Sequence, residues 1–112
     1  MTLGEYQTRA RSTATYPTEA ALLYPTLKLA GEAGEVAEKL GKAMRDAGWT
    51  PGTPVPEEVR APMIKELGDV LWYVASVAVD LGSSLDEVAE INLAKLASRA
   101  ERGVLHGTGD DR

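Results

Sequence analysis

The sequence predicts an all-α fold in which a short N-terminal helix and three longer helices form a bundle completed by oligomerisation. Two observations lead to this prediction. Apolar residues recur at positions i, i+3 and i+4 through most of the chain, which is the spacing of one helix face. Stretches rich in glycine and proline separate these segments, and no segment shows the two-residue alternation of a strand.

The first helix is expected to run from Leu3 to about Ala14. Thr2 and Glu5 have the spacing of a capping box, in which each side chain bonds to the other residue's backbone N–H. Pro17 ends the helical pattern soon afterwards.

The second helix is expected to end near Ala47, with Gly48 in the position after the C-cap. Pro25 either opens this helix or kinks it, and both readings fit the pattern. The proline- and glycine-rich residues 49–56 then form a loop.

The third helix is expected to begin between Glu57 and Pro62 and to run to Leu81, where Gly82 stops it. Its apolar residues cover most of the circumference, so it needs neighbours on several sides. We therefore predict a homo-oligomer, a dimer or a tetramer, with this helix at or near the interface.

The fourth helix is expected to start after Ser84, which forms a second capping box with Glu87, and to reach about Arg102. The chain thus reads as one all-α domain, residues 1–102, followed by a glycine-rich tail, residues 103–112. Disorder is the default expectation for such a tail.

The composition, 44% hydrophobic and 26% charged, is typical of a soluble globular domain. The absence of cysteine excludes disulfides and thiolate metal sites. The net charge of −5 disfavours a nucleic-acid polymer as partner. No apolar run approaches the ~20 residues of a membrane span, and no signal peptide is recognisable. We expect a cytoplasmic protein with no membrane partner.

Two acidic steps are the most informative feature: Glu32 with Glu35, and Glu66 with Asp69. In each step the first carboxylate lies at the edge of the apolar seam, and the second lies about 60° further round the helix. Like charges at this spacing repel, and a charge beside a core is costly unless it is paired or bound to a metal. Four such carboxylates from two helices suit Mg²⁺.

An ordinary charged surface explains the first helix equally well. Glu35 has Lys39 four residues on, and Glu38 has Lys42, which is a favourable arrangement for solvated pairs. The second step is harder to explain in this way, because Glu66 has no basic residue three or four positions away on its own helix.

The fourth helix carries Asn92, Lys95 and Arg99 on the face that it shares with its apolar seam. In one reading, the two basic side chains only extend from the edge of the seam into water. In the other, they form with the amide a patch that binds anionic oxygens.

Together these motifs resemble the MazG-like nucleotide pyrophosphohydrolases. The likeness covers residues 29–39 and 65–73, and Asn92 to Leu96 looks like the family's Asn-x-x-Lys-Leu. The ending, residues 107–112, is similar to the tails of small bacterial and phage members. Many members have a doubled glutamate at the first motif, where this chain has Gly31.

The resemblance implies subunits that pair to complete each bundle, and hydrolysis of a nucleoside triphosphate to the monophosphate and pyrophosphate in nucleotide-pool housekeeping. Mg²⁺, with Mn²⁺ as the alternative, would neutralise phosphate charge and activate a water. The implied roles fall on three sets of residues: metal ligands Glu32, Glu35, Glu66 and Asp69; a proton acceptor, Glu35 or Glu38; and substrate-binding residues Asn92, Lys95 and Arg99.

Two rival interpretations remain at this level. A ferritin-like di-metal protein would use Glu-x-x-His motifs, but the one histidine, His106, lies in the tail. A helical module that binds nucleotides or drives oligomerisation without turnover is compatible with the sequence. Trp49 or Trp72 could stack on a base or serve only in packing, and base and sugar preference stay open.

Overall fold

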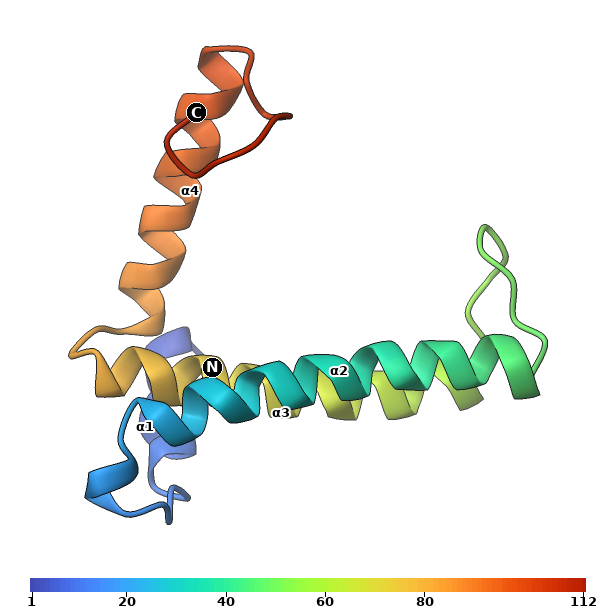
Figure 1. The fold of residues 1–112 in the computed structure, drawn as a ribbon, viewed down its shortest axis with the longest axis horizontal. Coiled ribbons are helices and arrows are strands. Elements are labelled where there is room, and N and C mark those ends of the chain that lie inside the picture. Colours follow the sequence, from blue (N-terminus) through green and yellow to red (C-terminus); the bar gives the residue numbers. More distant parts are fainter.

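The structure is a computed structural model that describes residues 1–112 as four α-helices and no strands (Figure 1). The all-α prediction is confirmed. The elements, in order, are α1 (Leu3–Arg11), the short 3₁₀ helix η1 (Thr18–Ala20), α2 (Leu23–Asp46), α3 (Glu57–Asp80) and α4 (Leu85–Glu101).

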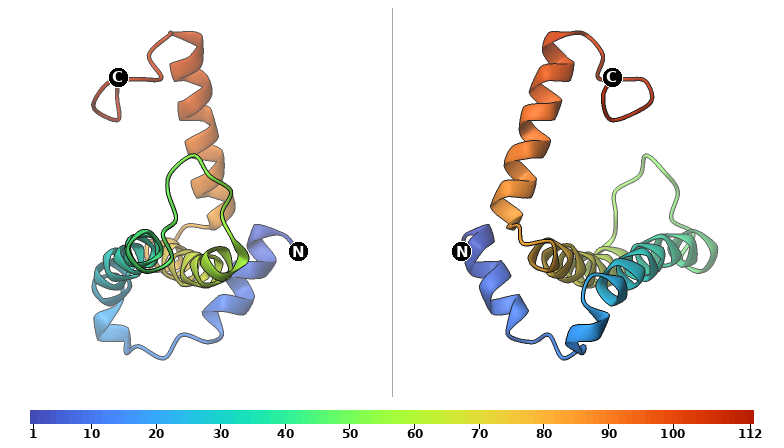
Figure 2. Two further views of the ribbon diagram at one scale, coloured as in Figure 1. Left: turned by 90° about the vertical axis from the view of Figure 1, so that its right-hand side faces the viewer. Right: turned by 60° about the vertical axis from the view of Figure 1, so that its left-hand side comes forward.

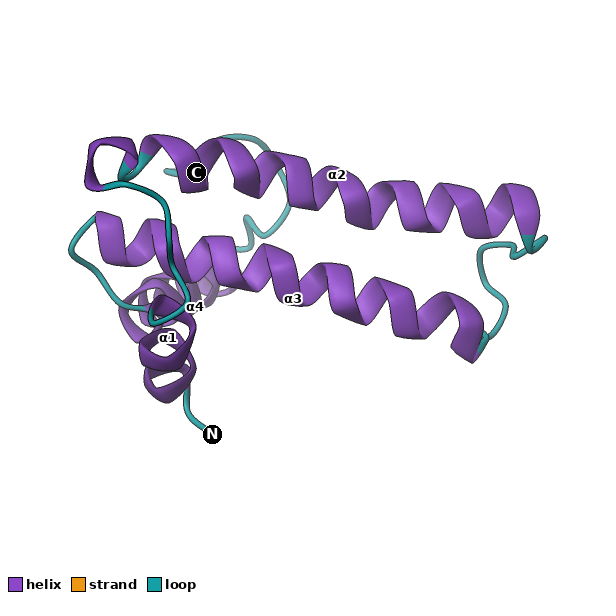
Figure 3. Cartoon of the chain, turned by 90° about the horizontal axis from the view of Figure 1, so that it is seen from below, coloured by secondary structure: helices purple, strands orange, loops and turns teal.

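The centre of the molecule is a hairpin of α2 and α3, each 24 residues long, which run antiparallel side by side (Figure 3). Gly48 follows α2 with φ +66°, the left-handed conformation expected after a helix C-cap. Pro25 does not kink α2. The helix begins two residues earlier, at Leu23, so Pro25 lies in the first turn, where an N–H would have no helical partner.

The N-terminal caps follow the sequence prediction with one difference. Thr2 and Glu5 form the complete capping box at the start of α1. Ser84 caps α4 by accepting from the N–H of Glu87, but the carboxylate of Glu87 accepts from the hydroxyl of Ser83 instead. The second capping box is therefore only half formed. The helix α1 also ends at Arg11, earlier than expected.

The helix α4 leaves the end of α3 and projects away from the hairpin (Figure 2). It is fastened at its start, where the side chain of Gln7 in α1 donates to the carbonyl of Ser83 (3.3 Å) and accepts from the N–H of Leu85 (2.7 Å). The radius of gyration is 17.0 Å, against about 13 Å for a compact domain of this length. A single chain is therefore an open L shape rather than a closed bundle.

Few side chains are covered in this open shape. Only 8 of 112 residues are buried, whereas Leu27, Ile91 and Leu93 are each more than 60% exposed. Apolar faces on both arms of the L are thus without cover in one chain. None of the helices combines the length and the apolar composition that a membrane span requires.

The tail is folded, so the expectation of disorder is wrong. It turns back on α4 (Figure 1), and the guanidinium of Arg112 donates to the carbonyls of Val104 (3.2 Å), Leu105 (2.9 Å) and Gly109 (2.6 Å). Composition alone did not reveal this, because the loop is held by bonds to backbone carbonyls, which every sequence possesses.

Candidate functional site

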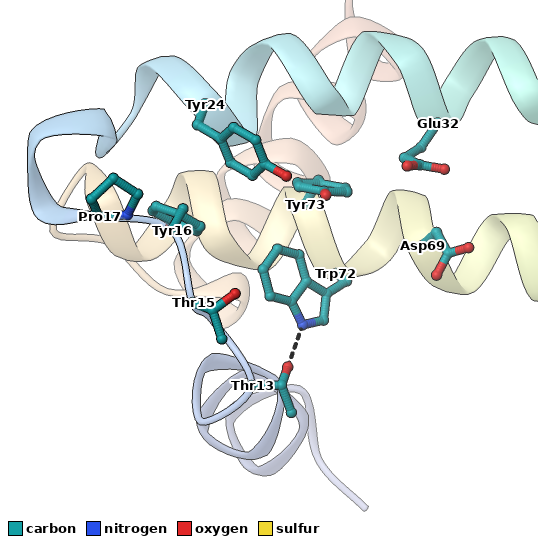
Figure 4. A pocket seen from close by; sticks show the side chains of 9 residues that line it. All are labelled: Thr13, Thr15, Tyr16, Pro17, Tyr24, Glu32, Asp69, Trp72 and Tyr73. Atoms are coloured by element: carbon teal, nitrogen blue, oxygen red, sulfur yellow. Dashed lines mark hydrogen bonds between the residues drawn. The ribbon is translucent and has the colours of Figure 1, made fainter.

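Three carboxylates converge on the hairpin, one from α2 and two from α3. One oxygen each from Glu32, Glu66 and Asp69 lies within 4.8 Å of the other two. The packing of α2 against α3 places Glu32 of α2 across from Asp69 of α3 (Figure 4). The side chains of Glu32 and Glu66 are 17% and 18% exposed, so repulsion between them is only partly screened by water.

Two lysines of α2 partly compensate this acidic cluster. Lys28 lies 3.5 Å from Glu32, and Lys39 lies 3.4 Å from Glu66. The pair expected between Lys39 and Glu35 is not formed, because Lys39 reaches across to α3 instead. Glu66 is therefore paired with a basic side chain, but one from α2 and not from its own helix. The cluster, three carboxylates against two ammonium groups, keeps an excess of negative charge.

The other two carboxylates proposed from the sequence lie on the exposed face of α2. Glu35 is outside the cluster and forms no ion pair. Glu38 forms the expected pair with Lys42 at 3.0 Å. A hydrogen bond from Lys42 is the main cause that lowers the pKa of Glu38, which makes its carboxylate a weaker base.

A pocket of about 620 Å³ adjoins the acidic cluster, between α2, α3 and the segment that follows α1. Glu32 and Asp69 lie at one end of the pocket in Figure 4. The rest of its wall comprises four aromatic residues, Tyr16, Tyr24, Trp72 and Tyr73, together with Thr13, Thr15 and Pro17.

The four rings form one connected cluster. Ring centroids are 5.4 Å apart for Tyr16 and Tyr24, 6.5 Å for Tyr16 and Trp72, and 4.8 Å for Trp72 and Tyr73. Of the two tryptophans considered from the sequence, Trp72 lines the pocket and Trp49 does not. The three tyrosines were missed as site residues. The sequence offered one signal for them: aromatic residues make up only 5% of the chain, so each of them was worth considering as a site residue.

Polar atoms of these rings are bonded within the protein. The indole N–H of Trp72 donates to the hydroxyl of Thr13 at 2.8 Å, and the hydroxyl of Tyr16 donates to Asp80 at 2.8 Å. Burial, followed by a hydrogen bond with Tyr24, raises the pKa of Tyr73 to about 12, so its phenol stays neutral at any working pH. These rings therefore keep few free polar atoms for a ligand, and the polar groups of the pocket are mainly its threonines and the carboxylates of Glu32 and Asp69.

The basic patch on α4 is formed, but in one chain it lies away from the acidic cluster, because α4 projects from the hairpin (Figure 1). Arg99 is buried, and its guanidinium donates to the carbonyls of Gly109 (3.3 Å) and Asp110 (2.6 Å). Lys95 lies 3.2 Å from the carboxylate of Asp110. Arg99 thus does not extend into solvent. Asn92, the third residue of this set, is exposed on the same helix.

A model of the MazG nucleotide pyrophosphohydrolase domain matches residues 23–104, most of the chain. This chain belongs to the MazG family. It is also 43% identical over 113 residues to the Gene 37 protein of Mycobacterium phage L5, with 96% of each chain covered, although that name states no activity. No solved structure matches it.

The MazG match contains the acidic cluster, Trp72, Tyr73 and the basic patch. It begins at Leu23, however. The pocket wall formed by residues 13–17 therefore lies outside the matched domain, as does most of the tail that covers Arg99.

Proposed function

We propose that this protein is a Mg²⁺-dependent nucleoside triphosphate pyrophosphohydrolase, which converts a nucleoside or deoxynucleoside triphosphate to the monophosphate and pyrophosphate in nucleotide-pool housekeeping. The observation that carries the proposal is the acidic cluster at the end of an aromatic pocket, in a chain of the MazG family. Such a pocket is suited to a base at one end and to metal-bridged phosphates at the other.

The residues present fit a hard divalent cation. Glu32, Glu66 and Asp69 supply only carboxylate oxygens, the donors that Mg²⁺ and Mn²⁺ prefer. Their separation of up to 4.8 Å needs only a small side-chain movement to reach the ~3 Å between neighbouring ligands, or the ~4 Å between opposite ligands, of an octahedral ion. Glu35, one turn beyond Glu32, is proposed as the fourth acid. When bound, the ion neutralises phosphate charge and acts as a Lewis acid.

The aromatic rings would hold the nucleobase by stacking, a contact that every base can make. A volume of about 620 Å³ lies within the usual range of small-molecule sites. Since Glu32 and Asp69 line one end of the same pocket, a base among the rings directs its phosphates towards the acidic cluster.

Among the two candidates for the proton acceptor, Glu35 is favoured over Glu38. Glu38 is held by Lys42, which lowers its pKa, and a general base works best when its pKa is close to the working pH. Glu35 forms no ion pair and is free to turn towards the cluster.

The residues proposed to bind phosphate, Asn92, Lys95 and Arg99, lie on α4, which projects away from the hairpin of its own chain (Figure 2). They must therefore reach the acidic cluster of another subunit. We therefore propose a homo-oligomer, a dimer or a tetramer, in which α4 of one chain packs on the α2–α3 hairpin of another. In that arrangement Lys95, assisted by Arg99 and oriented by Asn92, contacts the triphosphate once Lys95 leaves Asp110.

A pyrophosphate-release assay with a panel of nucleoside and deoxynucleoside triphosphates tests the function. We expect release that requires Mg²⁺ or Mn²⁺ and stops with a chelator, and a monophosphate as the second product. Release of single phosphate groups would contradict cleavage between the α and β phosphates. Nucleotide binding without any product would instead identify a binding module.

A further inference from the structure

One wall of the aromatic pocket comes from residues 13–22, a segment with little regular structure of its own. It joins α1 to α2 and contains only the three residues of η1. Thr13, Thr15, Tyr16 and Pro17 of this segment nevertheless line the pocket. Something outside the segment must therefore fix its position.

The anchor is Asp80, the last residue of α3, whose side chain is only 2% exposed. Its carboxylate accepts from the hydroxyl of Tyr16 and from the backbone N–H of Leu22, each at 2.8 Å, and lies 3.0 Å from Arg11. The guanidinium of Arg11 also donates to the hydroxyl of Tyr16. One buried carboxylate thus joins the end of α1, the pocket wall and the start of α2 to α3.

These bonds keep Asp80 charged. Burial acts to raise its pKa, but the bonds from Leu22, Tyr16 and Arg11 together hold the pKa below its usual value. A buried carboxylate with several donors is geometrically demanding, because the loss of any donor leaves part of the charge unsatisfied. The network therefore favours one position of the segment.

The backbone at Leu22 shows that the segment is held rather than relaxed. Leu22 has φ +64° and ψ −49°, the one non-glycine residue with positive φ in the chain. The N–H of Leu23 donates to the carbonyl of Ala21 at 2.7 Å, which closes a γ-turn of the strained kind. Such a conformation persists only where surrounding contacts impose it, and such places are often functional.

We propose that Asp80 is a positioning residue for the nucleobase, because it holds residues 13–22, and with them the ring of Tyr16, as the wall of the pocket beside Trp72. This inference rests on the proposed function only for what the pocket binds. Asp80 lies eleven residues after Asp69 on the same straight helix, or about 16 Å away, so it acts on the base end and not on the phosphate end.

The proposal predicts a selective effect. When Asp80 no longer holds the segment, the stacking surface loosens while the acidic cluster keeps its geometry. Nucleotide binding and KM should therefore change, whereas kcat and the binding of a ligand that has no base should not. A role in stability alone would lower the melting temperature without this separation.

The test uses Asp80→Asn, the milder Tyr16→Phe, which keeps the ring but removes its bond to Asp80, and Asp46→Asn as control. Asp46 is an exposed aspartate at the far end of α2, paired with Arg45. All three are made in a Trp49→Phe background, so that Trp72 is the only tryptophan. Trp72 fluorescence then reports the binding of deoxynucleoside monophosphates with Mg²⁺, and calorimetry reports the binding of inorganic tripolyphosphate.

We expect the monophosphate Kd to rise about tenfold or more in Asp80→Asn and a few-fold in Tyr16→Phe, the scale of one lost buried hydrogen bond or charge contact. Asp46→Asn should match the parent, and tripolyphosphate affinity should match in all variants. If the parent shows no turnover but Asp80→Asn still weakens monophosphate binding, the proposed function fails and this inference stands.

Equal monophosphate affinity in parent and folded Asp80→Asn would overturn the inference, and so would a parent whose Trp72 responds to no monophosphate. If Asp80→Asn does not fold, Tyr16→Phe decides the question. An unchanged Kd and KM in that variant, at an unchanged melting temperature, would overturn the proposal.

Discussion

The α2–α3 hairpin and the α4 arm carry the two charged groups that we propose to form one site, and a single chain positions these groups in different ways. In the hairpin, packing of two helices brings Glu32, Glu66 and Asp69 together without help from another subunit. On α4, Arg99 is covered by the chain's own tail, and Lys95 is paired with the tail residue Asp110. Folding of one chain thus assembles the acidic cluster. The proposed site also needs Lys95 and Arg99, which another subunit would supply.

The same contrast applies to apolar surface. Apart from the tail, the rest of the chain contacts the α4 arm only near its start, and Ile91 and Leu93 are more than 60% exposed. A 17-residue helix with so little packing is marginal in water. We therefore predict an obligate homo-oligomer that covers this arm. Light scattering at micromolar concentration checks it, and a monodisperse monomer of 11.9 kDa would contradict it.

The largest effect is expected in the hairpin. Glu66→Gln should lower Mg²⁺-dependent turnover by at least roughly two orders of magnitude, because it removes a proposed ligand at nearly constant volume. Without metal, the free energy of unfolding should change by less than about 1 kcal/mol, since the lost pair with Lys39 is partly exposed and repulsion within the cluster is relieved.

Assays of kcat/KM and thermal unfolding without metal check this prediction. Asp46→Asn serves as the control for loss of an acidic group elsewhere on the hairpin. Full activity in Glu66→Gln would remove the acidic cluster from the mechanism, and a large loss of stability would indicate a structural ion pair instead.

On the arm, Lys95→Ala should lower kcat/KM roughly ten- to a hundredfold, the effect of losing one charge-assisted contact to phosphate. Mg²⁺ affinity of the free protein should not change, because the acidic cluster belongs to the hairpin. Lys42→Ala, which removes an exposed lysine paired with Glu38, is the matched control. A change below about twofold in Lys95→Ala would mean that this lysine only holds the tail.

A smaller effect is expected from the lysine that compensates the acidic cluster. Lys39→Met removes a positive charge 3.4 Å from Glu66, so Mg²⁺ affinity should rise about two- to tenfold. Calorimetric titration of Mg²⁺ measures the change, with Lys42→Met as control. Weaker Mg²⁺ binding in Lys39→Met would show that the lysine organises the cluster rather than opposing the ion.

Local features of the fold could be predicted from the sequence. The cap at Thr2 and the stop at Gly48 depend on residues within one helical turn, and both are where they were expected. The convergence of Glu32 with Glu66 and Asp69 was also accessible, because the register of each acidic step against its apolar seam decides which side faces the other helix.

Features that depend on distant partners could not be predicted. Lys39 had acids available both on its own helix and across the hairpin, and the sequence gives no reason to prefer Glu66. Tyr16 contacts Trp72 with its ring and bonds to Asp80 with its hydroxyl, and both partners lie far from it in the sequence. The projection of α4 follows from the short connection after α3, whose path no local pattern specifies.

The smallest effect is expected from Glu38 on the outer face of α2, and comparing it with Glu35 on the same face separates the proposed site from the ordinary surface of the hairpin. Glu38→Gln should change kcat less than about twofold, because its carboxylate is exposed and engaged by Lys42. Glu35→Gln should lower kcat at least about tenfold, since this side chain is the proposed proton acceptor. It should also reduce the dependence of kcat/KM on pH at the acid side, which a lost surface charge would not do. Parallel pH–rate profiles of the two variants provide the measurement. Equal profiles for both would place Glu35, like Glu38, on the solvated face of α2 and leave the acidic cluster to act without it.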